Sequence, residues 1–182
     1  MGMEKQMDGN SRPVKHPGIA LCVCPGSYDP VTNGHLDIIR RAQSLFGHVC
    51  AGVLDNAAKQ YMFSAAQREQ MLREAAGGLP GVTVVRWDGL LVDLLSKLGT
   101  SVIVRGIRSS ADLAAEEQIA LVNRQLRPGT ETVFLPADPV WRGISSTIVR
   151  ELIRFNADVE AFVPQSVCRM LRERPGNETT RV

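Results

Sequence analysis

The sequence predicts an α/β fold: a five-stranded parallel sheet, doubly wound, with helices on both faces. Short β-branched runs alternate with longer segments of helical period along most of the 182 residues. This alternation is typical of parallel sheets, because a helix fills each crossover between neighbouring strands. The composition agrees, since 44% of the residues are apolar and 22% are charged, as in a globular domain.

Each predicted strand is a short apolar or β-branched run. The first follows from the apolar stretch Ile19–Val23, and the others read HVCAGVL, VTVVR, SVIVR and ETVFL. The predicted strands are residues 18–24, 48–54, 82–86, 101–105 and 131–135.

Six segments between and after these runs have the spacing of helices. In the first, Leu36, Ile39 and Ala42 recur at helical period. The second begins with Ser64 three residues before Gln67, the pattern of a capping box. The predicted helices are residues 34–46, 64–77, 89–98, 112–126, 145–154 and 164–173.

Residues 18–173 are expected to form one domain, between a disordered N-terminal extension at 1–17 and a flexible C-terminal tail at 174–182. No apolar stretch approaches the roughly 20 residues that cross a bilayer. The four cysteines are predicted to be buried, reduced thiols rather than metal ligands, because Cys22 and Cys24 have no matching His or Cys pair nearby. We therefore expect a cytoplasmic protein without membrane contact, and a net charge of +2 gives no argument for a nucleic-acid partner.

In a doubly wound sheet the ligand lies beyond the carboxyl ends of the strands, so the loops there carry the chemistry. The first strand is expected to end at Cys24, where Pro25 and Gly26 turn the chain. His35 then opens a helix, whose unpaired N–H groups make a natural anion site. The alternative is that His35 only bonds its own helix start.

Cations and hydroxyls follow three other strands. Arg105 and Arg108 flank a glycine beyond the fourth strand, and guanidinium groups match phosphate oxygens; the alternative is that they pair with Asp112 or Glu116. Lys59 follows the second strand, with a solvated loop lysine as the alternative. The run 145–147 (Ser-Ser-Thr) is either a helix cap or a cradle for a triphosphate, with Arg150 one turn further on.

There is no carboxylate cluster for tight metal binding and no Ser-His-Asp spacing. The residues together predict a site for a polyanion, most naturally a nucleotide, with no metal site on the protein itself.

Two motifs carry a resemblance to the nucleotidyltransferase superfamily. Thr32-Asn33-Gly34-His35 matches its [HT]-x-G-H motif, and the segment 144–150 (ISSTIVR) is similar to its I-S-S-T-x-x-R signature. More narrowly, the stretches PGSYDPVTNGHLDIIRRA, RGIRSSADLAAEEQIALVNRQL and WRGISST resemble the bacterial phosphopantetheine adenylyltransferases. The resemblance covers residues 18–173.

The resemblance implies a Rossmann-like fold and transfer of AMP from ATP to 4'-phosphopantetheine, giving dephospho-CoA and pyrophosphate. It also implies Mg²⁺ brought with ATP, a homohexamer, and coenzyme A as a feedback ligand. The implied catalytic residues are His35 and Lys59. The implied ATP-binding residues are Ser27, Tyr28, His35, Gly106, Ile107, Arg108, Glu116, Trp141, Arg142, Gly143, Ile144, Ser145, Ser146 and Thr147. The implied substrate-binding residues are Ser27, Lys59, Leu91, Arg105 and Glu151.

Two features depart from the family pattern. The segment 55–61 lacks the proline of the commoner N-P-x-K-x-x-x-F form, although the following Met62-Phe63 still places Lys59. The acidic and aromatic pattern after Asp112 is reduced, which predicts looser contacts to the adenine.

Two other functions stay open at this point. A sister nucleotidyltransferase acting on nicotinate mononucleotide or glycerol phosphate would share both motifs. A nucleotide-binding regulator that kept the fold and lost catalysis would bind ATP without turnover, although the intact His35 and the Arg pair argue against it.

Overall fold

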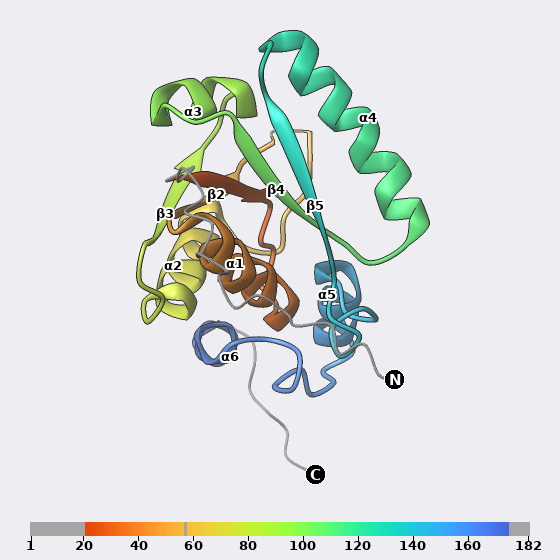
Figure 1. The fold of residues 1–182 in the computed structure, drawn as a ribbon. Coiled ribbons are helices and arrows are strands. Elements are labelled where there is room, and N and C mark those ends of the chain that lie inside the picture. The colour runs from red at the N-terminus through yellow and green to blue at the C-terminus, as the bar shows by residue number, and fades with distance from the viewer. Residues whose placement is uncertain (1–20, 57, 175–182) are drawn as a thin grey trace, which may run out of the picture.

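The computed structural model describes residues 21–174 except residue 57. Its centre is a five-stranded, all-parallel sheet with the strand order β3-β2-β1-β4-β5 (Figure 1). The chain therefore fills one half of the sheet from β1 outward, then crosses to the other side of β1 and fills the second half. The strands are β1 (Cys22–Gly26), β2 (Val49–Leu54), β3 (Val82–Trp87), β4 (Val102–Ile107) and β5 (Glu131–Pro136).

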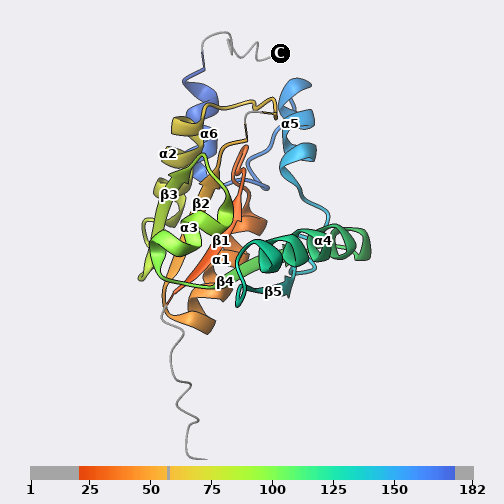
Figure 2. The ribbon, with the colours of Figure 1, turned by 90° about the horizontal axis from the view of Figure 1, so that it is seen from above.

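Helices cover both faces of this sheet, as the sequence predicts (Figure 2). On one face α1, α2 and α6 pack with α5 into the larger apolar cluster. On the other face α3 packs its leucines onto Val23, Cys50 and Ile103. The helices are α1 (Asn33–Phe46), α2 (Ala65–Ala76), α3 (Leu91–Leu98), α4 (Ser110–Leu126), α5 (Ser146–Arg154) and α6 (Gln165–Arg172).

The alternation of side chains along β1 explains its cysteines. Cys22 and Cys24 point into the larger cluster while Val23 points into the smaller one, as the period of two in a strand requires. Cys50 and Cys168 are also buried and free, so the prediction of buried thiols without disulfides is confirmed.

The predicted end of the first strand at Cys24 is wrong. β1 continues through Pro25 and Gly26, which lie opposite Gly52 and Val53 of β2. A proline is tolerated in this central strand because β1 pairs with β4 only at Val23. Beyond that residue the two strands no longer pair, and the sheet has a gap in its hydrogen bonding at the crossover point. The predicted residues 1–17 and 18–20, and all of the predicted tail except Arg174, lie outside the described residues.

Candidate nucleotide-binding site

A cavity of about 570 Å³ opens at the carboxyl ends of β1 and β4, where their pairing has stopped. This is the point at which the strand order reverses, the usual ligand position in doubly wound sheets. Most of the predicted site residues come together here from four separate segments. Those that line the cavity are Ser27, Tyr28, His35, Lys59, Arg105, Gly106, Arg108, Glu116, Trp141, Ile144, Ser145, Ser146 and Thr147.

His35 lies at the third position of α1 and forms a capping box with Thr32. The Thr32 hydroxyl accepts from the His35 amide at 3.3 Å, and the Thr32 amide donates to His35 Nδ1 at 3.0 Å. The alternative interpretation of His35, a helix-start residue bonded to its own backbone, is therefore correct for Nδ1. It leaves Nε2 free, because no described residue bonds to that atom.

The protonation state of His35 follows from these contacts. Burial, reinforced by the charges of Arg105 and Arg108, lowers the pKa of His35 from 6.5 to about 4. The ring is then neutral at pH 7, with one proton. Since the Thr32 amide donates to Nδ1, that proton is on Nε2. His35 is a neutral N–H donor lining the cavity, and it is not a general acid.

This lowered pKa predicts a pH dependence of stability. Between pH 6.5 and 4 the unfolded chain binds a proton at His35 that the folded chain does not bind, so the free energy of unfolding falls as pH falls through that window. From pH 7 to pH 4.5 the loss is about 2 kcal/mol. Urea unfolding across this range, on the wild type and on His35→Gln, measures it. The variant has a shallower decline, and parallel declines would contradict the lowered pKa.

The helix start offers fewer free donors than a bare N-terminus would. The amide of Asn33 donates to the Phe162 carbonyl at 2.9 Å, and the amide of His35 is capped by Thr32. Only the Gly34 amide of this first turn remains without a bond to any described residue. A Cβ at Gly34 would lie 3.3 Å from the Trp141 Cβ, so the glycine also lets the 141–147 segment approach the helix closely.

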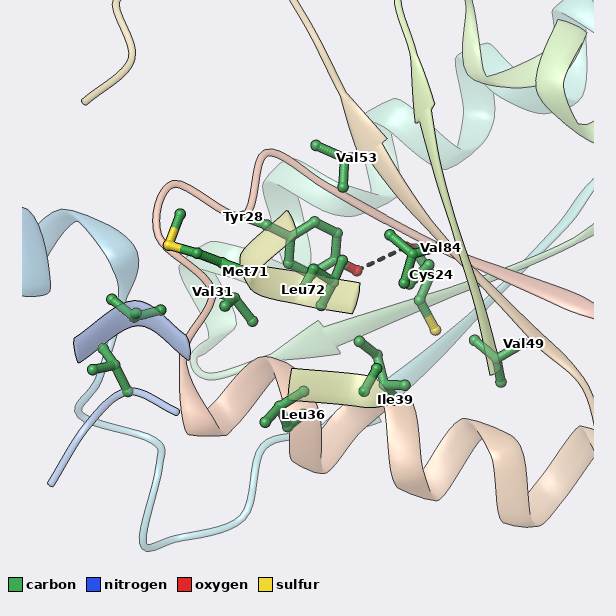
Figure 3. Packing of buried hydrophobic residues seen from close by; sticks show 14 of the residues in the cluster. Cys24, Tyr28, Val31, Leu36, Ile39, Val49, Val53, Met71, Leu72 and Val84 are labelled. Atoms are coloured by element: carbon green, nitrogen blue, oxygen red, sulfur yellow. Dashed lines mark hydrogen bonds between the residues drawn. The ribbon is translucent and has the colours of Figure 1, made fainter. Parts of the chain in front are cut away.

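Tyr28 packs against the His35 ring from the core of the domain. Its side chain is 4% exposed, packs among core residues, and donates from its hydroxyl to the Cys24 carbonyl at 2.8 Å (Figure 3). Its ring lies edge-on to the imidazole, with the ring centres 5.0 Å apart and the planes at 70°. Burial raises the pKa of the phenol well above its usual value, so it stays protonated. The hydroxyl is committed to the core, which leaves the predicted ATP contact of Tyr28 to its remaining atoms at the cavity wall.

The alternative interpretation of the arginine pair, ion pairs with Glu116 and Asp112, is observed in the structure. The Nε of Arg105 donates to Glu116 at 2.8 Å, and its other two nitrogens bond the second Glu116 oxygen and the Pro25 carbonyl. Arg108 pairs with Asp112 at 2.9 Å. The guanidinium groups still line the cavity, so α4 orients them there through its carboxylates. The acidic residue that the resemblance places near the nucleotide, Glu116, is in direct contact with the arginine placed at the acceptor.

The helix-cap interpretation of the Ser-Ser-Thr run is correct. Ser145 is the cap of α5 and accepts from the Ile148 amide at 3.2 Å, while the Ser146 hydroxyl donates to the Pro30 carbonyl at 2.8 Å. The amides of Ser146 and Thr147 form no bond within the described part of the chain and lie at a helix start. This capped helix start lines the cavity, so the triphosphate cradle stays a prediction that its two free amides allow.

Lys59 is exposed, and its ammonium group pairs with no side chain or carbonyl in residues 21–174, residue 57 apart. The backbone amide of Lys59 donates to the Asn56 carbonyl at 2.9 Å, and this bond closes a turn. The lysine lines both the main cavity and a second cavity of about 210 Å³, which also contains Leu91, Arg105 and Glu116. The two cavities share the wall in which the implied catalytic lysine lies.

Five predicted residues lie outside the main cavity wall, and one of them, Leu91, lines the second cavity. Ile107, Arg142 and Gly143 belong to segments that line it but do not do so themselves. Glu151 is exposed on α5 and lines neither cavity, so the structure does not bring it to the implied acceptor. Gly106 does line the main cavity, and a Cβ there would lie 2.7 Å from Ile38 of α1, which explains why this strand end needs a glycine.

Sequence reasoning missed two charged side chains that build this site. Asp29, 1% exposed, accepts from the amides of Met62 and Phe63 at 2.8 and 2.9 Å. Arg68, 0% exposed, bonds three carbonyls and Asp55. A signal for Arg68 was present: it lies three and four residues before Met71 and Leu72, on the apolar stripe of a helix.

The residues that the structure describes contain no group of three or more His, Cys, Asp or Glu side chains arranged to hold a metal ion. Among these same residues, every helix is too short or too polar to span a bilayer.

Comparison with known proteins identifies the family. Residues 23–152 match the family model described as cytidylyltransferase-like. A phosphopantetheine adenylyltransferase of Bifidobacterium longum (strain DJO10A) is 47% identical over 165 residues, which is 90% of this chain and 99% of the relative. That of Thermobifida fusca (strain YX) is 49% identical over 150 residues, 82% of this chain and 91% of the relative.

The likeness extends over the segments that form the cavity, from the end of β1 to the start of α5. With this extent of identity, the chain belongs to the cytidylyltransferase-like family and, within it, to the phosphopantetheine adenylyltransferases.

Proposed function

We propose that this enzyme transfers the adenylyl group of ATP to 4'-phosphopantetheine, giving dephospho-CoA and pyrophosphate, by direct in-line displacement. The observation that carries the chemical part is the neutral His35, with Nδ1 engaged by Thr32 and the Nε2 proton free, at a cavity that also holds Lys59 and Arg108. The identity of the acceptor follows from the family, because the similar proteins are named phosphopantetheine adenylyltransferases.

The reaction needs no general base. A phosphate oxygen of the acceptor attacks the α-phosphorus of ATP; a new P–O bond forms there while the bond to the bridging oxygen of pyrophosphate breaks. Since the second pKa of a phosphate monoester is about 6, the nucleophile is already ionised at pH 7. Catalysis is then positioning together with stabilisation of charge on the α-phosphoryl oxygens.

The cavity residues divide between the two ends of this reaction. His35 Nε2, the Gly34 amide and Lys59 supply donors to the α-phosphoryl group. Arg108 and the amides of Ser146 and Thr147 hold the β and γ phosphates. Arg105, on the wall shared with the second cavity, binds the acceptor phosphate. Leu91 packs against the apolar pantetheine arm of the acceptor.

The carboxylates of the site fit Mg²⁺ carried by ATP better than a tight protein site. Asp29 is bonded to two amides, Glu116 pairs with Arg105, and Asp112 pairs with Arg108. The ATP phosphates and water therefore supply most of the Mg²⁺ ligands, as Mg²⁺ generally prefers. When bound, the ion neutralises phosphate charge.

The proposed assembly is a homohexamer, and α4 is the surface that favours association. Its apolar side chains are unusually exposed, and Asn123 is the one buried residue of the helix. The exposed residues are Ile119 (52%), Leu121 (60%), Val122 (52%) and Leu126 (55%). α4 lies along the outer side of the molecule (Figure 1). In the proposed assembly a second copy covers these side chains. Sedimentation equilibrium tests this, and a single-chain mass at micromolar concentration would contradict it.

Two further properties belong to the same proposal. Coenzyme A carries the same pantetheine arm as the acceptor, so it is expected to compete at the second cavity as a feedback ligand. The four buried, free thiols suit the reducing cytoplasm.

The proposal is tested by pyrophosphate release from Mg·ATP with phosphopantetheine, nicotinate mononucleotide or glycerol phosphate supplied separately. Pyrophosphate release is expected with phosphopantetheine as the acceptor and with neither of the other two. Release with one of the other acceptors alone would assign the chain to a sister enzyme, and ATP binding without release in any mixture would make it a regulator.

A further inference from the structure

Arg68 of α2 is a buried charge for which the proposed reaction has no use. It is 0% exposed and lines neither the main cavity nor the second one. A guanidinium in a protein core stays charged, and burying it is unfavourable unless each donor is satisfied. The groups that satisfy it therefore indicate what the residue holds in place.

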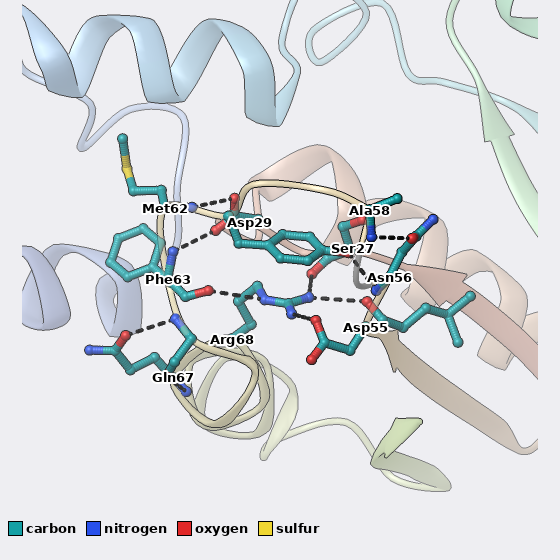
Figure 4. A network of polar contacts seen from close by, with 12 residues as sticks. Ser27, Asp29, Asp55, Asn56, Ala58, Met62, Phe63, Gln67 and Arg68 are labelled. Carbon is teal, nitrogen blue, oxygen red and sulfur yellow. Dashed lines mark hydrogen bonds and ion pairs between the residues drawn. The ribbon is translucent and has the colours of Figure 1, made fainter. Parts of the chain in front are cut away.

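The bonds of Arg68 all go to the edges of the loop that carries Lys59 and to the loop beside it (Figure 4). At the start of the Lys59 loop, Nη1 donates to the Leu54 carbonyl at 3.1 Å, and Nη2 donates to Asp55 at 2.6 Å. At its end, Nε donates to the Phe63 carbonyl at 3.2 Å. One planar group thus binds the residues on both sides of the 55–63 loop.

The same guanidinium joins this loop to the loop after β1. Nη1 also donates to the Ser27 carbonyl at 2.7 Å. Nearby, Asp29 receives the amides of Met62 and Phe63, so the two loops are bonded at two points. Ser27 precedes the turn that leads to His35, and Lys59 lies between the anchored ends of the other loop.

Tyr61 adds a contact from inside the loop. The Arg68 guanidinium lies 3.9 Å from the centre of the Tyr61 ring, and the Tyr61 hydroxyl accepts from the Asn56 amide at 2.9 Å. Asn56 itself receives the Ala58 amide on its side chain at 2.9 Å. The segment that lacks the family's proline is therefore held by a ring stacked on Arg68.

We infer that Arg68 is a positioning residue for the proposed adenylyl transfer: it fixes the Lys59 loop against the Ser27 loop, so that the lysine and His35 act on one phosphoryl group. This inference rests on the proposed function. It adds a residue that touches neither substrate and acts through Lys59.

The test compares Arg68→Lys with Arg73→Lys, the same change at an exposed position of the same helix. Arg73 is largely exposed and pairs only with Glu69 among the described residues, so its variant keeps wild-type kinetics. Lysine keeps the charge of Arg68 but lacks the fork that reaches both loop ends. Arg68→Lys lowers kcat/KM for phosphopantetheine about tenfold, while the KM for ATP changes less than about twofold.

A double-mutant cycle separates positioning from a general loss of structure. In a Lys59→Met background, Arg68→Lys has little further effect on kcat/KM, because its route to the reaction is already absent. The same tenfold loss in both backgrounds would overturn the inference. Wild-type kinetics for Arg68→Lys would also overturn it.

Two further measurements extend the test, and the second of them does not depend on the proposed reaction. Asp55→Asn keeps an acceptor oxygen but removes the negative charge that pairs with Arg68 at the half-exposed side, and it produces a smaller loss of the same kind; an unchanged kcat/KM counts against the inference. Hydrogen exchange reads the loop without any substrate. In Arg68→Lys the amides of 58–63 exchange faster, while those of β4 do not. If wild-type enzyme releases no pyrophosphate, the proposed function fails, and the exchange result still decides the role of Arg68 in holding the loop.

Discussion

Replacing His35 by glutamine is expected to lower kcat about 100- to 1000-fold with little change in the free energy of unfolding at pH 7. Glutamine suits this test because the capping box accepts it: the same chain uses Ser64 with Gln67 at the start of α2. The introduced glutamine can therefore keep the bond to the Thr32 amide through its Oε1. Its amide N–H groups lie on a more flexible side chain and do not hold the position of the ring Nε2–H. Steady-state kinetics with both substrates saturating gives kcat, and urea unfolding gives the stability.

The control for this variant is Gln67→His, the reverse exchange at the same position of the other capping box. That change is outside the site, because Gln67 is only partly exposed and lines neither cavity. It leaves kcat unchanged. Near-normal turnover in His35→Gln would contradict the role of the Nε2 donor, and a large loss of stability at pH 7 would show that glutamine does not preserve the cap.

Replacing Arg105 by alanine is expected to raise the KM for phosphopantetheine about 10- to 100-fold, because a charge-assisted bond to the acceptor phosphate is lost. The same change removes the partner of Glu116, whose side chain is 16% exposed. We expect the free energy of unfolding to fall by about 2 kcal/mol, less than for a fully buried pair, because solvent reaches both side chains. Acceptor kinetics and urea unfolding measure the two effects separately.

A second substitution separates these effects. In Arg105→Ala with Glu116→Ala, the unpaired carboxylate is gone, so most of the lost stability returns. The KM for the acceptor stays high, since the guanidinium is still missing. Recovery of the acceptor KM together with the stability would show that Arg105 has only a structural role.

The fold was predictable because its signal is repeated along the chain. Five β-branched runs alternate with helical segments, and each predicted strand and helix is present with ends shifted by a few residues. The largest functional consequence of such a shift is at β1. Pro25 and Gly26 have the local signature of a turn, yet they extend the strand, because β2 offers them backbone partners and β4 has already separated.

The site was predictable where the chemistry is local in sequence. His35 and Thr32 are three residues apart, and Ser145 caps the helix that it precedes. The partners of the arginines were harder to choose. Arg105 and Glu116 are joined only because α4 folds back along β4, so the sequence could offer that ion pair only as one alternative.

The partners of Arg68 and Asp29 could not be assigned from local patterns. The partners of Arg68 are mostly backbone carbonyls from three segments, and a carbonyl is present in every residue, so no pattern of side chains marks them. Such a group is found from packing, once the turn after β1 and the loop after β2 are known to meet.

The most direct test of the central claim offers the acceptors together. The enzyme is mixed with Mg·ATP and equal concentrations of phosphopantetheine, nicotinate mononucleotide and glycerol phosphate. The adenylylated products are identified by mass spectrometry, and pyrophosphate is measured over the same time course. The account predicts dephospho-CoA as the dominant product, in step with pyrophosphate, and its near loss in His35→Gln. Adenylylation of another acceptor in preference to phosphopantetheine, or dephospho-CoA formed equally fast by His35→Gln, would contradict it.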